Sequence, residues 1–171
     1  PLEGAYAPFY FLEQSPIQAL IHALKYQGKR RIAHWMAQQS AELLPKEHPV
    51  LQCDGIVPVP LHHSRQRKRG FNQVTGFGQC WATRLDVPFL DHLLLRKNQT
   101  RTLVHMSRES RWEEVKNAFS IRPRKEYKHL LLVDDVITTG ATLTACGNIL
   151  LNGACDKISV MGVAFAQNIL P

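Results

Sequence analysis

The segment LLLVDDVITTGATL, residues 130–143, gives the clearest signal of the fold. Its first four residues form an apolar run, which is typical of a strand buried on both faces of a parallel sheet. Two carboxylates, Asp134 and Asp135, follow directly. A small, hydroxyl-rich turn then leads into apolar residues at helical spacing from Leu143 onward. The stretch therefore predicts a buried strand, a tight turn and a helix, with two acidic residues at the solvent-facing end of the strand.

The turn has the composition of an anion site. Free backbone N–H groups and the positive end of the helix dipole meet where a helix begins after such a turn. Because like charges repel, the two aspartates suit vicinal hydroxyls, a Mg²⁺ ion or both, rather than a phosphate. A ribose 5-phosphate would satisfy the whole segment; the alternative is an ordinary strand–turn–helix with a solvated acidic end. The candidate phosphate-binding residues are Thr138, Thr139, Gly140, Ala141 and Thr142.

A second segment, VPVPLHHSRQRKRGFNQ (residues 57–73), concentrates positive charge. Its prolines stiffen the end of a predicted strand, and Gly70 permits a turn before a helix that we expect near Phe71. Between them we expect a mobile basic loop that binds pyrophosphate or nucleic acid. The alternative is a solvated basic loop without a ligand. The candidate residues of this loop are Pro60, Leu61, Arg65, Arg67, Lys68 and Arg69.

The composition limits the class of protein. A chain of 171 residues, 44% hydrophobic and 20% charged, is typical of one globular domain. It contains no apolar run of 18 residues and no signal-peptide pattern, so we expect no membrane span and a cytoplasmic location. The four cysteines form no C-x-x-C pair, so we expect buried reduced thiols and no zinc in this chain. Residues 61–128 hold 15 Lys/Arg and 6 Asp/Glu, which predicts a basic face.

The order of apolar patterns predicts an α/β fold with a largely parallel sheet. We expect residues 1–50 to form a helical segment packed on a core of residues 51–171. Ligands of such sheets bind beyond the carboxyl ends of the strands, where residues 58–61 and 134–142 should meet. Helices are expected from residue 15, after residue 28, and over 71–85, 107–116 and 142–152; strands are expected over 55–60, 89–95, 128–136 and 158–166.

Three segments together resemble the ComF family of competence-associated, phosphoribosyltransferase-like proteins, which includes GntX-like members. They are LKYQGKRR (residues 24–31), residues 57–73 and residues 130–143. The resemblance covers nearly the whole chain and implies a type I phosphoribosyltransferase fold. Residues 96–119 match less well, since Leu103 and Glu114 stand where Gln and Asn are usual. Many members also carry an N-terminal four-cysteine zinc module; its absence here indicates a trimmed chain or a natural variant.

The resemblance implies 5-phosphoribosyl-1-pyrophosphate (PRPP) as the ligand, bound with Mg²⁺. Asp134 and Asp135 would be the catalytic pair, holding the ribose hydroxyls and, through the ligand, the metal ion. One hypothesis is a phosphoribosyltransferase, in which a nucleophile attacks the anomeric carbon while pyrophosphate departs. The other is a non-catalytic single-stranded DNA-binding protein that retains the fold and serves the DNA-uptake machinery. A fold hosts many activities, so the resemblance does not choose between them, and the acceptor has no readable code.

Overall fold

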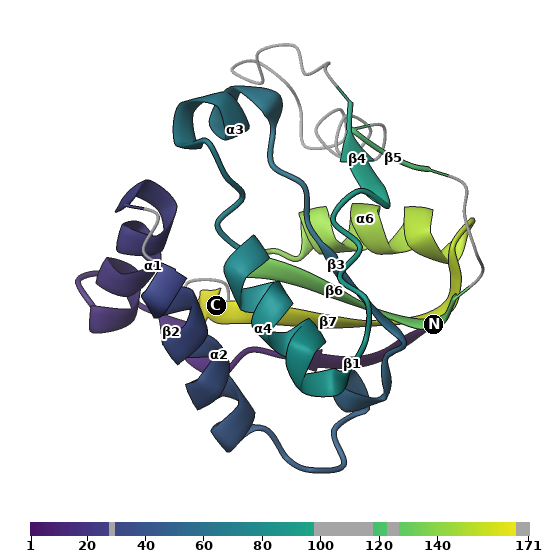
Figure 1. Cartoon of the computed structure of the whole chain (residues 1–171), viewed down its shortest axis with the longest axis horizontal. Coiled ribbons are helices and arrows are strands. Elements are labelled where there is room, and N and C mark those ends of the chain that lie inside the picture. Colours follow the sequence, from purple (N-terminus) through teal and green to yellow (C-terminus); the bar gives the residue numbers. More distant parts are fainter. Residues whose placement is uncertain (28–29, 98–117, 123–126, 167–171) are drawn as a thin grey trace.

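The computed structural model describes residues 1–27, 30–97, 118–122 and 127–166. Its centre is a parallel sheet (Figure 1) whose strands are β1 (Leu2–Tyr6), β2 (Phe9–Phe11), β3 (Gly55–Pro58), β6 (Tyr127–Ile137) and β7 (Cys155–Ala166). The strand order is β1-β7-β6-β3, and β2 also pairs with β7. All of these pairs are parallel. The predicted α/β fold with a parallel sheet is confirmed.

Helices cover the two faces of this sheet unequally (Figure 1). One face packs against α1 (Pro16–Gln27), α2 (Arg30–Leu43) and α4 (Thr75–Leu85). The opposite face packs against α6 (Ala141–Leu151) and a small antiparallel pair, β4 (Leu94–Arg96) with β5 (Phe119–Ile121). Two short helices, η1 (Pro49–Gln52) and α3 (His63–Arg69), precede and follow β3.

The position of β6 in the sheet explains why residues 130–133 form an unbroken apolar run. Leu131 and Val133 belong to the core beneath α1, α2 and α4, whereas Leu130 and Leu132 belong to the core beneath α6. Side chains alternate along a strand, so a strand covered on both faces needs apolar residues at every position. All four side chains are fully buried. Burial of each contributes about 1.5–3 kcal/mol relative to exposure, which anchors the residues that follow.

The N-terminal region joins the same sheet. Strand β1 pairs with β7 from Leu2, opposite Ile158, to Tyr6, opposite Met161. The Tyr6 hydroxyl donates to the Ser40 carbonyl at 3.0 Å and so ties β1 to α2. Residues 1–50 therefore contribute two short strands as well as the two predicted helices.

The expectation of a basic loop at residues 60–69 was wrong for most of that segment, because residues 63–69 form helix α3. The His62 Nδ1 accepts the Ser64 N–H at 3.2 Å at the start of the helix. Gly70 ends the helix with φ +74°, and its N–H donates to the Gln66 carbonyl at 2.7 Å. Arg, Gln and Lys are good helix formers, and the two caps satisfy free backbone groups despite the repulsion between like charges.

Other elements differ in their bounds. Helix α4 begins at Thr75 rather than near Phe71, because the Asn72 side chain donates to the Val59 carbonyl at 2.9 Å and accepts the Val74 N–H at 3.3 Å. The strand expected over 89–95 is reduced to β4, with one bridge between Phe89 and Ile56. The helix expected over 107–116 lies outside the described residues.

Two further sequence expectations concern membranes and thiols. Among the helices described, none is both long and apolar enough to cross a membrane. Cys53, Cys146 and Cys155 are buried free thiols, and Cys80 is a half-buried free thiol. Burial raises the pKa of Cys53 and of Cys155 to about 11, so both remain protonated near neutral pH.

Candidate functional site

The candidate site lies where β3 and β6 end. Pro58 pairs with Val133, and the Val59 N–H donates to the Val133 carbonyl at 2.9 Å. The chain that follows each strand therefore emerges at the same edge of the sheet. Figure 1 shows α1 and α3 at the end of the sheet where β7 finishes. The segments expected to meet, 58–61 and 134–142, do leave the sheet at this edge.

Asp135 is buried and held from three sides. Its Oδ2 lies 2.7 Å from the Lys25 Nζ of α1 and accepts the Gln73 Nε2 at 2.9 Å. Its Oδ1 accepts the Val136 N–H at 2.7 Å. The sequence led us to expect both carboxylates at a solvent-facing strand end, and for Asp135 this was wrong. The ammonium and the amide come from elements distant in sequence, which cover this carboxylate.

Asp134 has a different environment. Its Oδ1 accepts the Asp135 N–H at 2.8 Å, and within the described chain no cation forms an ion pair with it. Burial, and then the negative charge of Asp135, raise the pKa of Asp134 to about 7. Desolvation and a like charge both disfavour the ionised form, so this carboxyl group can exchange a proton near neutral pH.

The predicted phosphate turn leads straight from β6 into α6. Gly140 stands immediately before the helix at φ +73°, a conformation that side-chain-bearing residues rarely adopt. The Thr139 Oγ1 accepts the Ala141 N–H at 3.4 Å. Thr138 and Thr139 are exposed, and Ala141 and Thr142 are half-buried. The turn thus presents hydroxyls and the first N–H groups of α6 beside the two aspartates.

Helix α3 brings the predicted basic residues to the same edge. Arg65, Arg67 and Lys68 are exposed, whereas Arg69 is half-buried. The Arg69 Nη1 donates to the Gln73 Oε1 at 2.9 Å, and its guanidinium lies 5.0 Å from the centre of the Tyr26 ring. Since Gln73 also donates to Asp135, one amide connects the basic helix to the buried carboxylate. Pro60 and Leu61 are half-buried in the connection from β3 to α3.

Arg96 lies on β4, on the face of the sheet that α6 covers. Its guanidinium lies 5.2 Å from the centre of the buried Phe119 ring. Its Nε is buried and has no hydrogen-bond partner among the described residues. Burial lowers the pKa of Arg96, the positive charge of Arg65 lowers it further, and Asp134 raises it. The pKa of Arg96 therefore depends on charges of both the basic helix and the diacid.

The sequence did not single out Lys25, Gln73 or Arg96 as site residues. Lys25 stands within the LKYQGKRR segment and Gln73 ends the basic segment, so both belong to segments that carry the family resemblance. Their contacts with Asp135 span 110 and 62 positions of the chain, and no periodicity signals such pairs. Arg96 lay in the segment with the weaker family resemblance.

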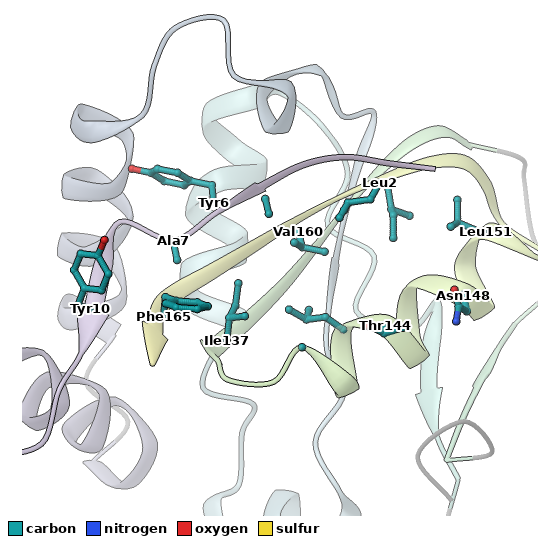
Figure 2. Close-up of a pocket in the computed structure, with 14 residues that line it drawn as sticks. Leu2, Tyr6, Ala7, Tyr10, Ile137, Thr144, Asn148, Leu151, Val160 and Phe165 are labelled. Atoms are coloured by element: carbon teal, nitrogen blue, oxygen red, sulfur yellow. The ribbon is translucent and has the colours of Figure 1, made fainter. Parts of the chain in front are cut away.

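A separate apolar groove of about 560 Å³ lies between α6 and the β1 edge of the sheet. Figure 2 shows Leu2, Ile137, Val160 and Phe165 around it, with Thr144 and Asn148 from α6. The groove reaches Gly140 but includes neither aspartate and no residue of α3. An apolar lining does not suit a polyphosphate, so the diacid edge remains the candidate site.

The diacid fits a Mg²⁺ ion only if other groups complete the coordination. In the described part of the chain, no three His, Cys, Asp or Glu side chains gather closely enough to hold a metal ion. Mg²⁺ requires six oxygen ligands and usually takes several from water and from phosphates of its substrate. Two carboxylates, one of them already bound to Lys25, are compatible with a metal ion that a ligand helps to hold.

Several known proteins are similar to this chain. Competence protein F of Haemophilus influenzae is 35% identical over 161 residues, which cover 88% of this chain and 69% of that protein. The chain belongs to the competence protein F family. DNA utilization protein YhgH of Salmonella typhimurium is 35% identical over 148 residues, covering 85% of this chain and 65% of that protein. Competence protein ComFC of Bacillus subtilis is 32% identical over 114 residues, which cover 65% of this chain and 42% of that protein. No protein-family model matches the chain.

Solved structures offer a looser comparison for this member of the competence protein F family. A glutamine PRPP amidotransferase from B. subtilis has a TM-score of 0.49 at 17% identity, covering 83% of this chain and 26% of that chain. An adenine phosphoribosyltransferase from Leishmania tarentolae has a TM-score of 0.39 at 14% identity, and the match covers 92% of this chain and 74% of that chain. Both scores lie below 0.5, so no residue role is transferred from either structure.

Proposed function

We propose that this chain binds a 5-phosphoribosyl ligand, PRPP or a close relative, at the edge formed by β3 and β6. The observation that carries the proposal is the convergence of three chemically different groups. Carboxylates at Asp134 and Asp135, the N-terminus of α6 and the basic residues of α3 meet at one edge. PRPP carries a diol, a monophosphate and a pyrophosphate, so each group has a chemical counterpart.

The monophosphate would bind at residues 138–142, where free N–H groups of α6 and threonine hydroxyls are available. The diol would bind at the diacid, and Asp134 supplies the open carboxylate. The pyrophosphate would lie toward Arg65 and Arg96, whose like charges approach each other. Two cations near one another, one with a buried donor lacking a partner, are stabilised by an anion between them.

Mg²⁺ is the cation we expect with this ligand, held by Asp134 together with oxygens of the ligand. It would neutralise charge on the departing pyrophosphate if transfer occurs. The chain itself would orient the ribose through the diacid and keep the negative charge of the leaving group close to Arg96 and α3.

A second candidate function is single-stranded DNA binding at α3, without transfer. The exposed cations of α3 favour it, and so does the neighbouring Tyr26 side chain, which is 55% exposed. Binders of single strands combine basic residues with aromatic surfaces. Two other aromatic side chains near the basic segments suit this role less, since Phe119 is buried and Phe71 is half-buried. Trp112 lies outside the described residues. The relatives named for competence and DNA utilization are compatible with this candidate.

A ligand screen tests the proposal directly. Thermal unfolding is measured with PRPP, ribose 5-phosphate, nucleotides and a single-stranded oligonucleotide, each with and without Mg²⁺. A ligand at 100 times its Kd stabilises the folded state by about 2.7 kcal/mol. We expect Mg²⁺-dependent stabilisation by PRPP. Stabilisation by the oligonucleotide alone would favour the second candidate and contradict the phosphoribosyl proposal.

A further inference from the structure

The Lys25 ammonium binds the Asp135 carboxylate at a position that a metal ion could otherwise take. Its Nζ lies 2.7 Å from the Asp135 Oδ2, and the two side chains are only 23% and 13% exposed. The same oxygen also accepts the Gln73 Nε2, and the other oxygen accepts the Val136 N–H. Each oxygen of Asp135 is therefore already bound by a donor from the chain.

Asp134 contrasts with its neighbour. Its Oδ1 accepts a hydrogen bond from the Asp135 N–H, and its side chain also interacts with that of Asp135. Lys25 forms its ion pair with the Asp135 carboxylate. The ammonium thus neutralises one of two adjacent carboxylates. A free Mg²⁺ ion that approached the diacid would meet one open carboxylate and a nearby positive charge, and repulsion between two cations in a partly buried site is strong.

We propose that Lys25 is a specificity-determining residue that prevents the diacid from binding Mg²⁺ alone, so that the metal ion binds only together with a phosphorylated ligand. This inference rests on the proposed function for the identity of that ligand. An anionic ligand adds the negative charge and the extra oxygens that a diacid paired with Lys25 lacks. Lys25 acts through Asp135 and is a positioning residue rather than a catalytic one.

A purely structural lysine would behave differently. If Lys25 only attached α1 to the sheet, its replacement would lower stability and leave the affinity for Mg²⁺ unchanged. If it acts as the counter-cation, its neutralisation removes the positive charge that opposes a metal ion at the diacid. The affinity for Mg²⁺ alone then rises, which is the opposite of what damage to a site produces.

The experiment is calorimetric titration with MgCl₂ alone at constant ionic strength, on the wild type and three variants. K25M removes the charge, and K25R keeps it. K157M is the matched control, because Lys157 forms an exposed ion pair with Glu3 at 3.7 Å, beside His129 and away from Asp134. We expect K25M to bind Mg²⁺ at least about tenfold more tightly than the other three proteins. Equal affinity in K25M and K157M would overturn the inference.

A second measurement covers the case in which K25M does not fold, as judged by circular dichroism. The ¹⁵N resonance of the Lys25 Nζ is followed in the wild type during titration with MgCl₂, and then with MgCl₂ and PRPP. We expect no change with MgCl₂ alone and a change when both are present. A shift with millimolar MgCl₂ alone would show that the ion reaches the diacid despite Lys25, and would contradict the inference.

The titrations also separate this inference from the proposed function. If K25M gains affinity for Mg²⁺ but the wild type binds no PRPP under any condition, the role of Lys25 stands and the phosphoribosyl proposal fails. If the wild type binds PRPP with Mg²⁺ and K25M gains no affinity for the ion, the proposed function stands and the inference about Lys25 fails.

Discussion

The turn at residues 138–142 and helix α3 border the same site, but different contacts hold them. The turn continues directly from β6, whose residues Leu130 to Val133 are fully buried, and it leads into a helix with its own buried face. Helix α3 has no buried residue among its described side chains, and Arg69 joins it to Gln73 and Tyr26. The turn is thus preformed by the core, whereas α3 depends on caps and on one polar residue.

We infer from this difference that the turn and α3 suit different chemical groups of a ligand. A rigid turn suits a constant group such as a phosphate, since its N–H groups need no rearrangement on binding. A short, exposed and highly charged helix suits a group that leaves or varies, such as pyrophosphate or a nucleic-acid backbone. The predictions below test the turn, α3 and the diacid that lies between them.

The largest effect should come from the diacid. Replacing Asp134 and Asp135 together by Asn should abolish Mg²⁺-dependent PRPP binding, because a hydrogen bond to a charged group contributes roughly 1.5–3 kcal/mol and two groups change. Calorimetry with PRPP and MgCl₂ measures the loss. The control is D91N/D156N, which removes the same charge from two exposed aspartates. Unchanged PRPP affinity in the D134N/D135N protein would contradict the phosphoribosyl proposal.

The next effect concerns α3 and decides between its two candidate ligands. Alanine at Arg65, Arg67, Lys68 and Arg69 together should flatten the salt dependence of single-stranded DNA binding if the helix contacts nucleic acid. Each phosphate contact contributes about 0.7 to the logarithmic slope, so the loss of three or four contacts lowers it by roughly 2–3.

If α3 binds pyrophosphate instead, the same variant should lose PRPP affinity while any DNA salt slope stays nearly constant. Both ligands are titrated on one protein preparation, with R84A as a control for loss of an exposed basic residue elsewhere. A variant unchanged toward both ligands would mean that α3 is a solvated surface.

Two glycines offer a matched test of the comparison. Gly140 and Gly70 have φ of +73° and +74°, and at both a Cβ would meet no heavy atom within 4 Å. Valine at either position should therefore cause similar backbone strain, about 1–2 kcal/mol in the free energy of unfolding. Only G140V should also abolish ribose 5-phosphate binding, because its side chain would occupy the approach to the first N–H groups of α6. Normal binding by G140V would place the phosphate elsewhere.

The last effect is a pH dependence of stability. Burial and Asp135 raise the pKa of Asp134 from 3.8 to about 7. Between pH 3.8 and about 7 the folded state then binds more protons than the unfolded state. Protonated Asp134 contributes its full stabilisation below pH 3.8, and this contribution is lost as the pH rises toward 7. The slope is at most about 1.4 kcal/mol per pH unit. Urea unfolding of the wild type and D134N across this range measures it, and identical slopes would contradict the assignment to Asp134.

Local sequence predicted the elements whose signals are contained in one segment. The apolar run of β6, the two aspartates and Gly140 lie within 11 positions, and burial on both faces accounts for the pattern. Helices α1 and α6 were likewise predictable from apolar spacing and from capping at Ser15, whose Oγ accepts the Gln18 N–H at 3.1 Å. The edge strands β1 and β2 were not, since segments of five and three residues carry too little periodicity.

Local patterns therefore sufficed to predict the parallel sheet, a turn at residues 138–142 and a diacid after a central strand. The tertiary structure was needed to show that Asp135, and not Asp134, is paired with a cation, because Lys25 and Gln73 reach Asp135 from α1 and from the segment before α4. It also decided that the basic residues form a helix connected to the diacid through Arg69 and Gln73. Strand patterns reflect burial at successive residues, whereas side-chain pairs between distant segments depend on how those segments pack, which no local pattern encodes.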